Sequence, residues 1–258
     1  FLLDALDQRR LDLQRDIVKN ERRQSYENRP YGAAGLTLQS TLYPSPHPYH
    51  WPTIGFHEDL DSATLEDVKN FFMRFYSPSN ASLSIAGDID GGKTRELVER
   101  YFADIPPGPI LSRANRTDSP LSGKSEVTLF DKVLLPRAFF AWPSVPLFHP
   151  DEPPLTILAT ILSNGRSSRL HRKFVLGSQI AQDIGVFQDS AEIAGSFEID
   201  VLASDGHSIQ EIQASLYNEI SDVCTYEPSQ EELDRAKNRI EWRHVRQRMN
   251  IGGFSGKA

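Results

Sequence analysis

Eight consecutive residues, 87–94 (GDIDGGKT), match the G-x-x-x-x-G-K-[ST] spacing of a phosphate-binding loop. In such a loop the backbone amides hold the phosphates, Lys93 would reach the outer phosphates and Thr94 would hold Mg²⁺. Two carboxylates, Asp88 and Asp90, lie inside the segment that would cradle the anion, and no second nucleotide motif follows. The pattern therefore favours a glycine-rich turn between a strand and a helix, with nucleotide binding as an alternative.

A carboxylate, Glu21, lies on an apolar stripe of the first expected helix. Leu13 and Ile17 precede it at intervals of four residues, and Gln14 lies two turns before it on the same face. A carboxylate on a buried apolar face costs free energy unless it is paired, protonated or bound to metal. The simpler interpretation is an ion pair with a cation of the basic run 19–23, so periodicity leaves both roles open.

Other residues that could do chemistry form weaker patterns. His47 and His50 have H-x-x-H spacing, but they lie in a proline-rich segment where a packed loop is the simpler interpretation. Glu241 and His244 have the spacing of a di-iron helix, but the sequence contains no second copy. Cys224 lies on or beside an apolar helix face and is interpreted as a core residue. No residue of this chain is assigned as catalytic.

Hydrophobic periodicity predicts the order of helices and strands. In the first part we expect a helix over 1–27, a helix before 77, a strand over 81–86 and a third helix. In the second part we expect strands over 125–131, 137–143, 180–188 and 195–203, helices near 152–164 and 167–176, and two long final helices. Capping boxes are predicted at Thr64–Asp67 and Ser229–Glu232.

The order of these elements predicts an α+β fold with antiparallel sheets flanked by paired helices. Strands joined by short turns favour antiparallel pairing, and the helices do not alternate strictly with strands as in a doubly wound parallel sheet. The segment 104–124 is rich in Pro, Gly, Ser and Asn and holds few large apolar side chains. We therefore expect two domains, 1–109 and 125–258, joined by a linker over 110–124.

Composition excludes several classes of protein. The 258 residues contain 35 acidic and 28 basic side chains, for a formal charge of −7, which disfavours a nucleic-acid partner. No apolar run approaches the roughly 20 residues that a membrane-spanning helix needs. A single cysteine excludes an intrachain disulfide framework and a cysteine-rich zinc finger.

Several stretches, in the same order, resemble the insulinase/pitrilysin family of zinc peptidases, the inverzincins, which includes the mitochondrial processing peptidase. The first is the segment 17–32 (IVKNERRQSYENRPYG). The others are 47–55 (HPYHWPTIG), 75–81 (FYSPSNA) with the strand to Gly87-Asp88, 101–106 (YFADIP), 165–170 (GRSSRL) and 252–254 (GGF). The resemblance covers essentially the whole chain. It implies that residues 87–94, which match a phosphate-binding loop, form the strand-to-helix turn of this family.

The resemblance implies a metal site. Family members hold Zn²⁺ with the two histidines of an H-x-x-E-H helix and with a glutamate farther along the chain. A different glutamate, the one inside the motif, is the general base for a zinc-bound water that attacks the peptide carbonyl. On this mapping Glu21 is the third zinc ligand. Gln14 stands where many members have a second glutamate, and it could support the site by hydrogen bonding but not by charge.

The sequence contains no H-x-x-E-H, so we expect that motif upstream of Phe1. We expect this chain to be a piece of a bacterial zinc metalloendopeptidase, inactive and zinc-free alone. It would comprise the end of one homologous α+β half (1–109) and most of the next (125–258). Implied partners are a peptide substrate and a second half or partner subunit that closes a chamber, and the expected location is periplasmic or extracytoplasmic. The alternatives are a non-catalytic partner or structural subunit of the same fold, and a nucleotide-binding protein that uses 87–94.

Overall fold

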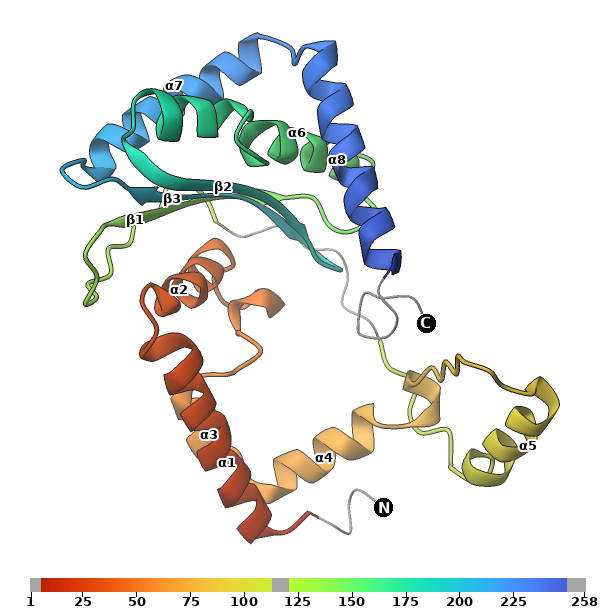
Figure 1. Ribbon diagram of the computed structural model, residues 1–258. Helices are drawn as coiled ribbons and strands as arrows, with labels where there is room; N and C mark the ends of the chain where they lie inside the picture. The colour runs from red at the N-terminus through yellow and green to blue at the C-terminus, as the bar shows by residue number, and fades with distance from the viewer. Residues whose placement is uncertain (1–5, 113–120, 250–258) are drawn as a thin grey trace. The chain divides into compact units, whose positions relative to one another are not determined.

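The computed structural model describes residues 6–112 and 121–249 (Figure 1). Contacts between residues divide the chain into two compact units. Unit 1 contains Phe1–Arg22, Ile54–Ala114 and Gln247–Ala258, and unit 2 contains Arg23–Thr53 and Asn115–Arg246. The resemblance at 252–254 and the middle of the expected linker lie outside the described residues. The segment 23–53 groups with the second part of the chain, whereas the division at 110–124 stays a prediction.

Unit 1 is built from short helices. They are α1 (Gln8–Arg22), α3 (His57–Ser62), α4 (Leu65–Phe75), the 3-10 turn Pro78–Asn80 and α5 (Gly91–Phe102). The predicted capping box at the start of α4 is confirmed, because the Thr64 hydroxyl accepts from the Asp67 amide and the Asp67 carboxylate accepts from the Thr64 amide. The pKa of Asp67 is held below its ordinary value by these bonds with Thr64.

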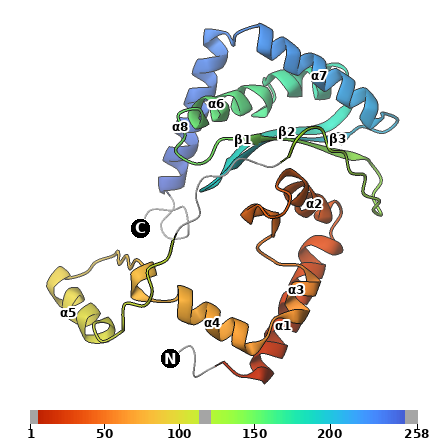
Figure 2. The same cartoon turned by 180° about the vertical axis from the view of Figure 1, so that it is seen from behind.

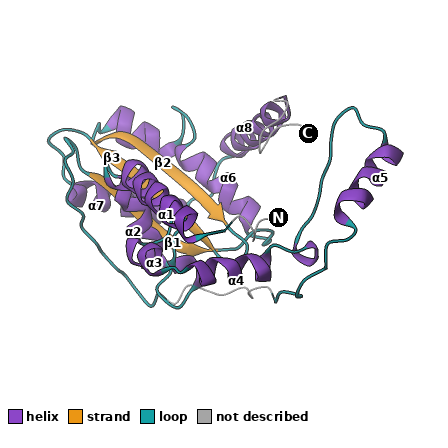
Figure 3. Cartoon of the chain, turned by 90° about the horizontal axis from the view of Figure 1, so that it is seen from below, coloured by secondary structure: helices purple, strands orange, loops and turns teal. Residues whose placement is uncertain are grey.

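Unit 1 contains no buried side chain among its described residues. Leu83 and Ile85, the apolar residues of the expected strand at 81–86, are exposed. That segment is drawn as loop in Figure 3, so the strand prediction is wrong. A strand needs a neighbour to satisfy its backbone groups, and the described part of unit 1 supplies no strand to pair with it.

Unit 2 is organised around a three-stranded antiparallel sheet in the order β1-β3-β2. The strands are β1 (Arg137–Ser144), β2 (Ala181–Ser190) and β3 (Gly195–Ala203), in which Ile199 lies opposite both Phe140 and Val186. The antiparallel pairing and three of the expected strands are confirmed. The expected strand at 125–131 is wrong, because those residues are exposed and irregular and precede β1 without pairing with it.

The two faces of the sheet bury different parts of unit 2. On one face lie α6 (Glu152–Ser163), the π-helix η5 (His171–Gly177) and α7 (Ile209–Thr225) (Figures 1 and 2). Leu162, Phe174 and Leu216 from these helices pack against Ile199 and Val201 of β3. This cluster is the main core, because alternate residues of each strand point into it.

The opposite face of the sheet carries the segment that begins at residue 23. This segment contains the π-helix η2 (Arg23–Glu27), α2 (Gly32–Leu42) and the 3-10 turn η3 (Pro48–His50). Leu42 and Tyr43 are buried with Ala194, and Ala141 of β1 packs against them. The Tyr43 hydroxyl donates to the Gly195 carbonyl, and burial raises the pKa of Tyr43 to about 12. This long-range bond ties residues near the start of the chain to β3.

The final helix, α8 (Gln230–Met249), is attached to unit 2 through its first turns. The predicted capping box is confirmed, since the Ser229 amide donates to Glu232 at 2.9 Å and the Glu232 amide donates to the Ser229 hydroxyl at 3.3 Å. Arg169 makes a two-bond ion pair with the same carboxylate, at 2.7 and 2.8 Å. A search of the described helices finds none both long and apolar enough to cross a membrane.

Candidate metal-ligating face

The helix α1, which carries Glu21, packs on the rest of unit 1 through its basic face. Arg15, Lys19 and Arg22 are spaced four and three residues apart, so they share one side of the helix. Their acceptors lie in α3 and its flanks: Leu60 O (2.6 Å) and Ala63 O (2.8 Å) for Arg15, the Asp61 carboxylate (2.6 Å) for Lys19, and Gly55 O for Arg22. The hydrogen bond from Lys19 lowers the pKa of Asp61.

The apolar stripe of α1 lies on the side away from these contacts. Leu13 is 58% exposed and Ile17 is 47% exposed, and Gln14 and Glu21 are exposed beside them. The expectation that this stripe is buried is therefore wrong for the described chain. The physical reason is that the cations of α1 find their acceptors on α3, which turns the apolar side outward.

The Glu21 carboxylate makes no hydrogen bond or ion pair with any described residue, although the chain places cations close by in sequence. Lys19 binds Asp61 and Arg22 binds the Gly55 carbonyl, and the Arg22 guanidinium also lies 5.8 Å from the centre of the Phe56 ring. The periodicity left two roles open for Glu21, an ion pair with a nearby cation or a bond to a metal. The structure does not form an ion pair of Glu21 with Lys19 or Arg22. Glu21 instead shares an exposed helix face with Gln14.

The side chains on this face of α1 can supply one ligand to a zinc ion, but they cannot form a complete zinc site. Zinc sites use about four ligands, usually including His or Cys. Within residues 6–112 and 121–249, no three His, Cys, Asp or Glu side chains gather closely enough to hold a metal ion. An accessible, unpaired carboxylate such as Glu21 can supply one oxygen, and the other donors would have to come from elsewhere. Gln14 carries an amide that can hydrogen-bond on the same face.

The histidines of the proline-rich segment are used inside their own loop. His47 is buried, its Nδ1 accepts from the Tyr49 amide at 3.0 Å, and its ring stacks on Tyr43. His50 Nδ1 lies 3.1 Å from the Tyr43 carbonyl. These contacts agree with a packed loop. The interpretation of Cys224 as a core residue is wrong, because its side chain is exposed near the end of α7.

The turn at 87–94 is arranged as a capped helix start. The Asp90 carboxylate accepts from the Lys93 amide at 2.8 Å, and the Thr94 hydroxyl donates to the Asp90 carbonyl at 2.7 Å. Asp90 therefore occupies an amide that a phosphate-binding loop would offer to its anion, and no strand precedes the turn. The geometry speaks against nucleotide binding here.

Two features of this region were missed from the sequence. The spacing of Arg15, Lys19 and Arg22 could have shown that α1 has a cationic face to satisfy. The π-helix η2, which directly follows α1, carries no signature in the one-letter sequence because it depends on contacts with α2.

Comparison with known proteins identifies relatives of this chain. A family model described as "Peptidase M16 inactive domain" matches residues 62–240. The Zinc protease PqqE of Helicobacter pylori is 31% identical over 176 residues, which cover 65% of this chain and 38% of that protein. The aligned part of this chain therefore covers less than half the length of that relative.

Solved structures share the fold. A crystal structure of a protease from Helicobacter pylori matches with a TM-score of 0.79 and 24% identity, covering 94% of this chain and 59% of that one. A peptidase M16 inactive domain from Pseudomonas fluorescens matches with a TM-score of 0.74 and 19% identity, covering 92% and 57%. These likenesses confirm the α+β fold expected from the order of helices and strands. Because the family model matches more than half of the chain, this chain belongs to the peptidase M16 family, the insulinase/pitrilysin-like peptidases that its sequence resembles.

Proposed function

We propose that this chain is part of a zinc metalloendopeptidase and that Glu21 is one of the zinc ligands. Zinc in such a site activates a water for attack on a peptide carbonyl. The other ligands and the general base come from polypeptide outside this chain, which lacks H-x-x-E-H. The chain alone is therefore inactive, and its substrates are peptides.

The observation that carries this proposal is the unpaired, exposed carboxylate of Glu21. The carboxylate is free to accept a ligand, because the neighbouring cations Lys19 and Arg22 bind acceptors on and beside α3. The flanking Leu13 and Ile17 give this face apolar surface that another part of the protein can cover. Together these features supply a ligand at the edge of an interface.

The role of Gln14 follows from its place on the same helix face. It lies seven residues before Glu21, which is about two helical turns. Its amide can donate a hydrogen bond to a carboxylate oxygen or to a bound water, and it adds no negative charge. Gln14 would therefore orient groups at the site while leaving its net charge unchanged.

The exposed apolar side chains in the described part of unit 1 favour a partner that covers this unit. Its apolar side chains include Phe71, Met73 and Tyr76 of α4 and the residue after it, and all three are exposed. A folded unit without buried residues gains little hydrophobic stabilisation by itself. A further peptidase half or subunit that packs on unit 1 would supply the missing core and the remaining zinc ligands.

The test uses the complete gene product, purified with its bound metal. Glu21→Gln removes the charge and keeps the shape, so we expect zinc affinity to fall at least about 100-fold and peptide cleavage to be lost. Asp16→Asn is the matched control, because Asp16 is exposed on α1 and has no partner among the described residues. Zinc is measured by chelator competition and cleavage with a fluorogenic peptide. Equal zinc affinity in the two variants would refute the role of Glu21.

A second candidate is a non-catalytic subunit of the same fold. It is favoured by the description "inactive domain" of the family model that matches 62–240, a range that does not include Glu21. A complete gene product that folds but binds no zinc and cleaves no peptide would support this candidate. Stoichiometric zinc that is lost in Glu21→Gln would exclude it.

A further inference from the structure

A small cavity lies in unit 2 between the end of α6, the turn that follows it and the first turns of α8. Its volume is about 10 Å³, which is room for one water-sized group. The polar residues on its wall are Thr160 and Asn164 from α6 and its end, Ser168 from the turn, and Glu232, Arg235 and Arg239 from α8. All of them belong to unit 2, so the cavity is formed within a single compact unit.

The two hydroxyl groups of the wall already donate to backbone carbonyls. The Thr160 hydroxyl donates to the Thr156 carbonyl at 2.8 Å, and the Ser168 hydroxyl donates to the Gly165 carbonyl at 2.6 Å. A hydroxyl has a single hydrogen, so neither group can also donate to an occupant of the cavity. The Asn164 side chain, by contrast, makes no hydrogen bond with any described residue, and its amide can donate.

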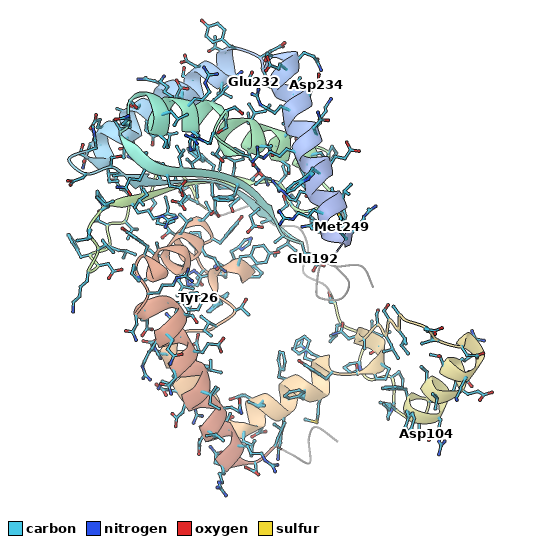
Figure 4. All side chains as sticks on the ribbon, in the orientation of Figure 1. Tyr26, Asp104, Glu192, Glu232, Asp234 and Met249 are labelled. Carbon is cyan, nitrogen blue, oxygen red and sulfur yellow. The ribbon has the colours of Figure 1, made fainter. Side chains whose placement is uncertain are left out.

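Two charged residues of the wall are already paired. Glu232, which is labelled in Figure 4, accepts two hydrogen bonds from Arg169, at 2.7 and 2.8 Å, and one from the Ser229 amide at 2.9 Å. Arg235 lies 3.3 Å from the Glu231 carboxylate. Each of these two ion pairs carries no net charge, so the remaining guanidinium on the wall gives the cavity a positive charge.

That guanidinium belongs to Arg239, and it has no acceptor among the described residues. It lies against the turn at Gly165, where a built Cβ would be 2.9 Å from the Arg239 Cζ and 3.0 Å from its Nη2. Glycine at position 165 therefore leaves the space in which the guanidinium lies. A guanidinium offers five N–H donors and no acceptor, and it binds a carboxylate through two parallel hydrogen bonds.

We propose that this cavity binds one carboxylate group, which is held by Arg239 and Asn164. One carboxylate oxygen fills the cavity, whose volume admits a single group of that size, and the charge of the ligand neutralises Arg239. Because the Glu232 carboxylate also lines the cavity, a singly charged ligand is favoured over a doubly charged one. The carboxylate belongs either to a small free molecule or to an acidic side chain outside the described residues, and the test distinguishes these two sources. The site is independent of the proposed metal ligand.

The first arm of the test titrates the complete gene product with sodium acetate and follows the melting temperature. Acetamide, which has the same shape without the charge, is the control ligand. If the ligand is a free molecule, acetate stabilises the wild type, and Arg239→Gln weakens acetate binding at least about tenfold, as expected for the loss of a charge-assisted hydrogen bond. Arg243→Gln is the matched control, because Arg243 is exposed on α8 one turn farther along and does not line the cavity. It should change acetate affinity by less than about twofold.

The second arm detects a carboxylate that the protein itself supplies. In that case acetate has no effect on the wild type, and Arg239→Gln lowers the melting temperature by at least about 2 °C more than Arg243→Gln does. The difference should shrink as the pH falls from about 5 to 3, because the carboxylate becomes protonated while arginine stays charged. A purely structural role of the arginine would not give this pH dependence.

Three results would overturn the proposal. Acetate could stabilise Arg239→Gln as strongly as the wild type, or acetamide could act as well as acetate. In the absence of an acetate effect, Arg239→Gln could melt together with Arg243→Gln, which would mean that the cavity holds only water. A melting difference that persists unchanged at pH 3 would equally exclude a carboxylate.

Discussion

The ion pair between Arg169 and Glu232 provides a quantitative prediction about stability. One Glu232 oxygen accepts from Arg169 at 2.7 Å, and the other accepts from Arg169 at 2.8 Å and from the Ser229 amide at 2.9 Å. The Glu232 side chain is 18% exposed and the Arg169 side chain is 23% exposed. Figure 4 shows Glu232 at the first turns of α8, where this pair ties the helix to the rest of unit 2.

The size of the effect follows from the pKa of Glu232. The hydrogen bond from Arg169 is the largest cause that lowers this pKa from 4.5 to about 2, with the Ser229 amide contributing. At about 1.4 kcal/mol for each pH unit, the shift sets a ceiling of about 3 kcal/mol. Solvent screening of a partly exposed pair reduces this to about 1–2 kcal/mol. Because the pKa is lowered on folding, this stability is present above about pH 4.5 and is lost as the pH falls toward 2.

The variant Glu232→Gln removes the charge and keeps the size of the side chain. We expect it to lower the free energy of unfolding at pH 7 by about 1–2 kcal/mol, measured by urea titration followed by circular dichroism. The difference from wild type should shrink as the pH falls from 4.5 to 2.5.

The matched control for this prediction is the neighbouring residue. Glu231 is 88% exposed and lies 3.3 Å from Arg235, so Glu231→Gln should cost less than about 0.5 kcal/mol. Equal costs for the two variants, or a Glu232→Gln deficit that does not change with pH, would refute the reasoning.

Two further predictions concern the core of unit 2. Leu216 is fully buried among α6, η5 and β3, so Leu216→Ala should lower the free energy of unfolding by about 2–5 kcal/mol, whereas Leu129→Ala at an exposed position should change it by less than about 0.5 kcal/mol. Burial raises the pKa of Tyr43 to about 12, so the folded state loses stability as the pH rises from 10 to 12. Tyr43→Phe should abolish this loss of stability. Urea titrations at several pH values will measure it, and a pH dependence that is unchanged in the variant would contradict the prediction.

Local patterns in the sequence predicted local structure well. Both capping boxes formed as expected, at Thr64 and at Ser229, because each needs only residues three apart. The hairpin of β2 and β3 was also predictable, since its apolar residues alternate and its turn is short. The strands expected at 81–86 and 125–131 were wrong for a common reason: alternation shows that a segment can pair, but pairing requires a partner strand beside it.

The candidate site shows the same limit. The sequence indicated Glu21 as a residue that needs a partner, and the family resemblance suggested a metal. It did not show that Arg15 and Lys19 would find acceptors on α3 and leave Glu21 unpaired.

The sequence by itself determined the family and the α+β class, since these depend on residue types and their spacing, and it singled out Glu21 as the carboxylate for which we propose a metal-binding role. Only the tertiary structure decided which face of α1 is exposed, because that choice depends on where the acceptors of α3 lie. It also decided that the turn after Glu21 is π-helical. Such features arise from contacts between segments, and the free energy of those contacts is not contained in any local pattern.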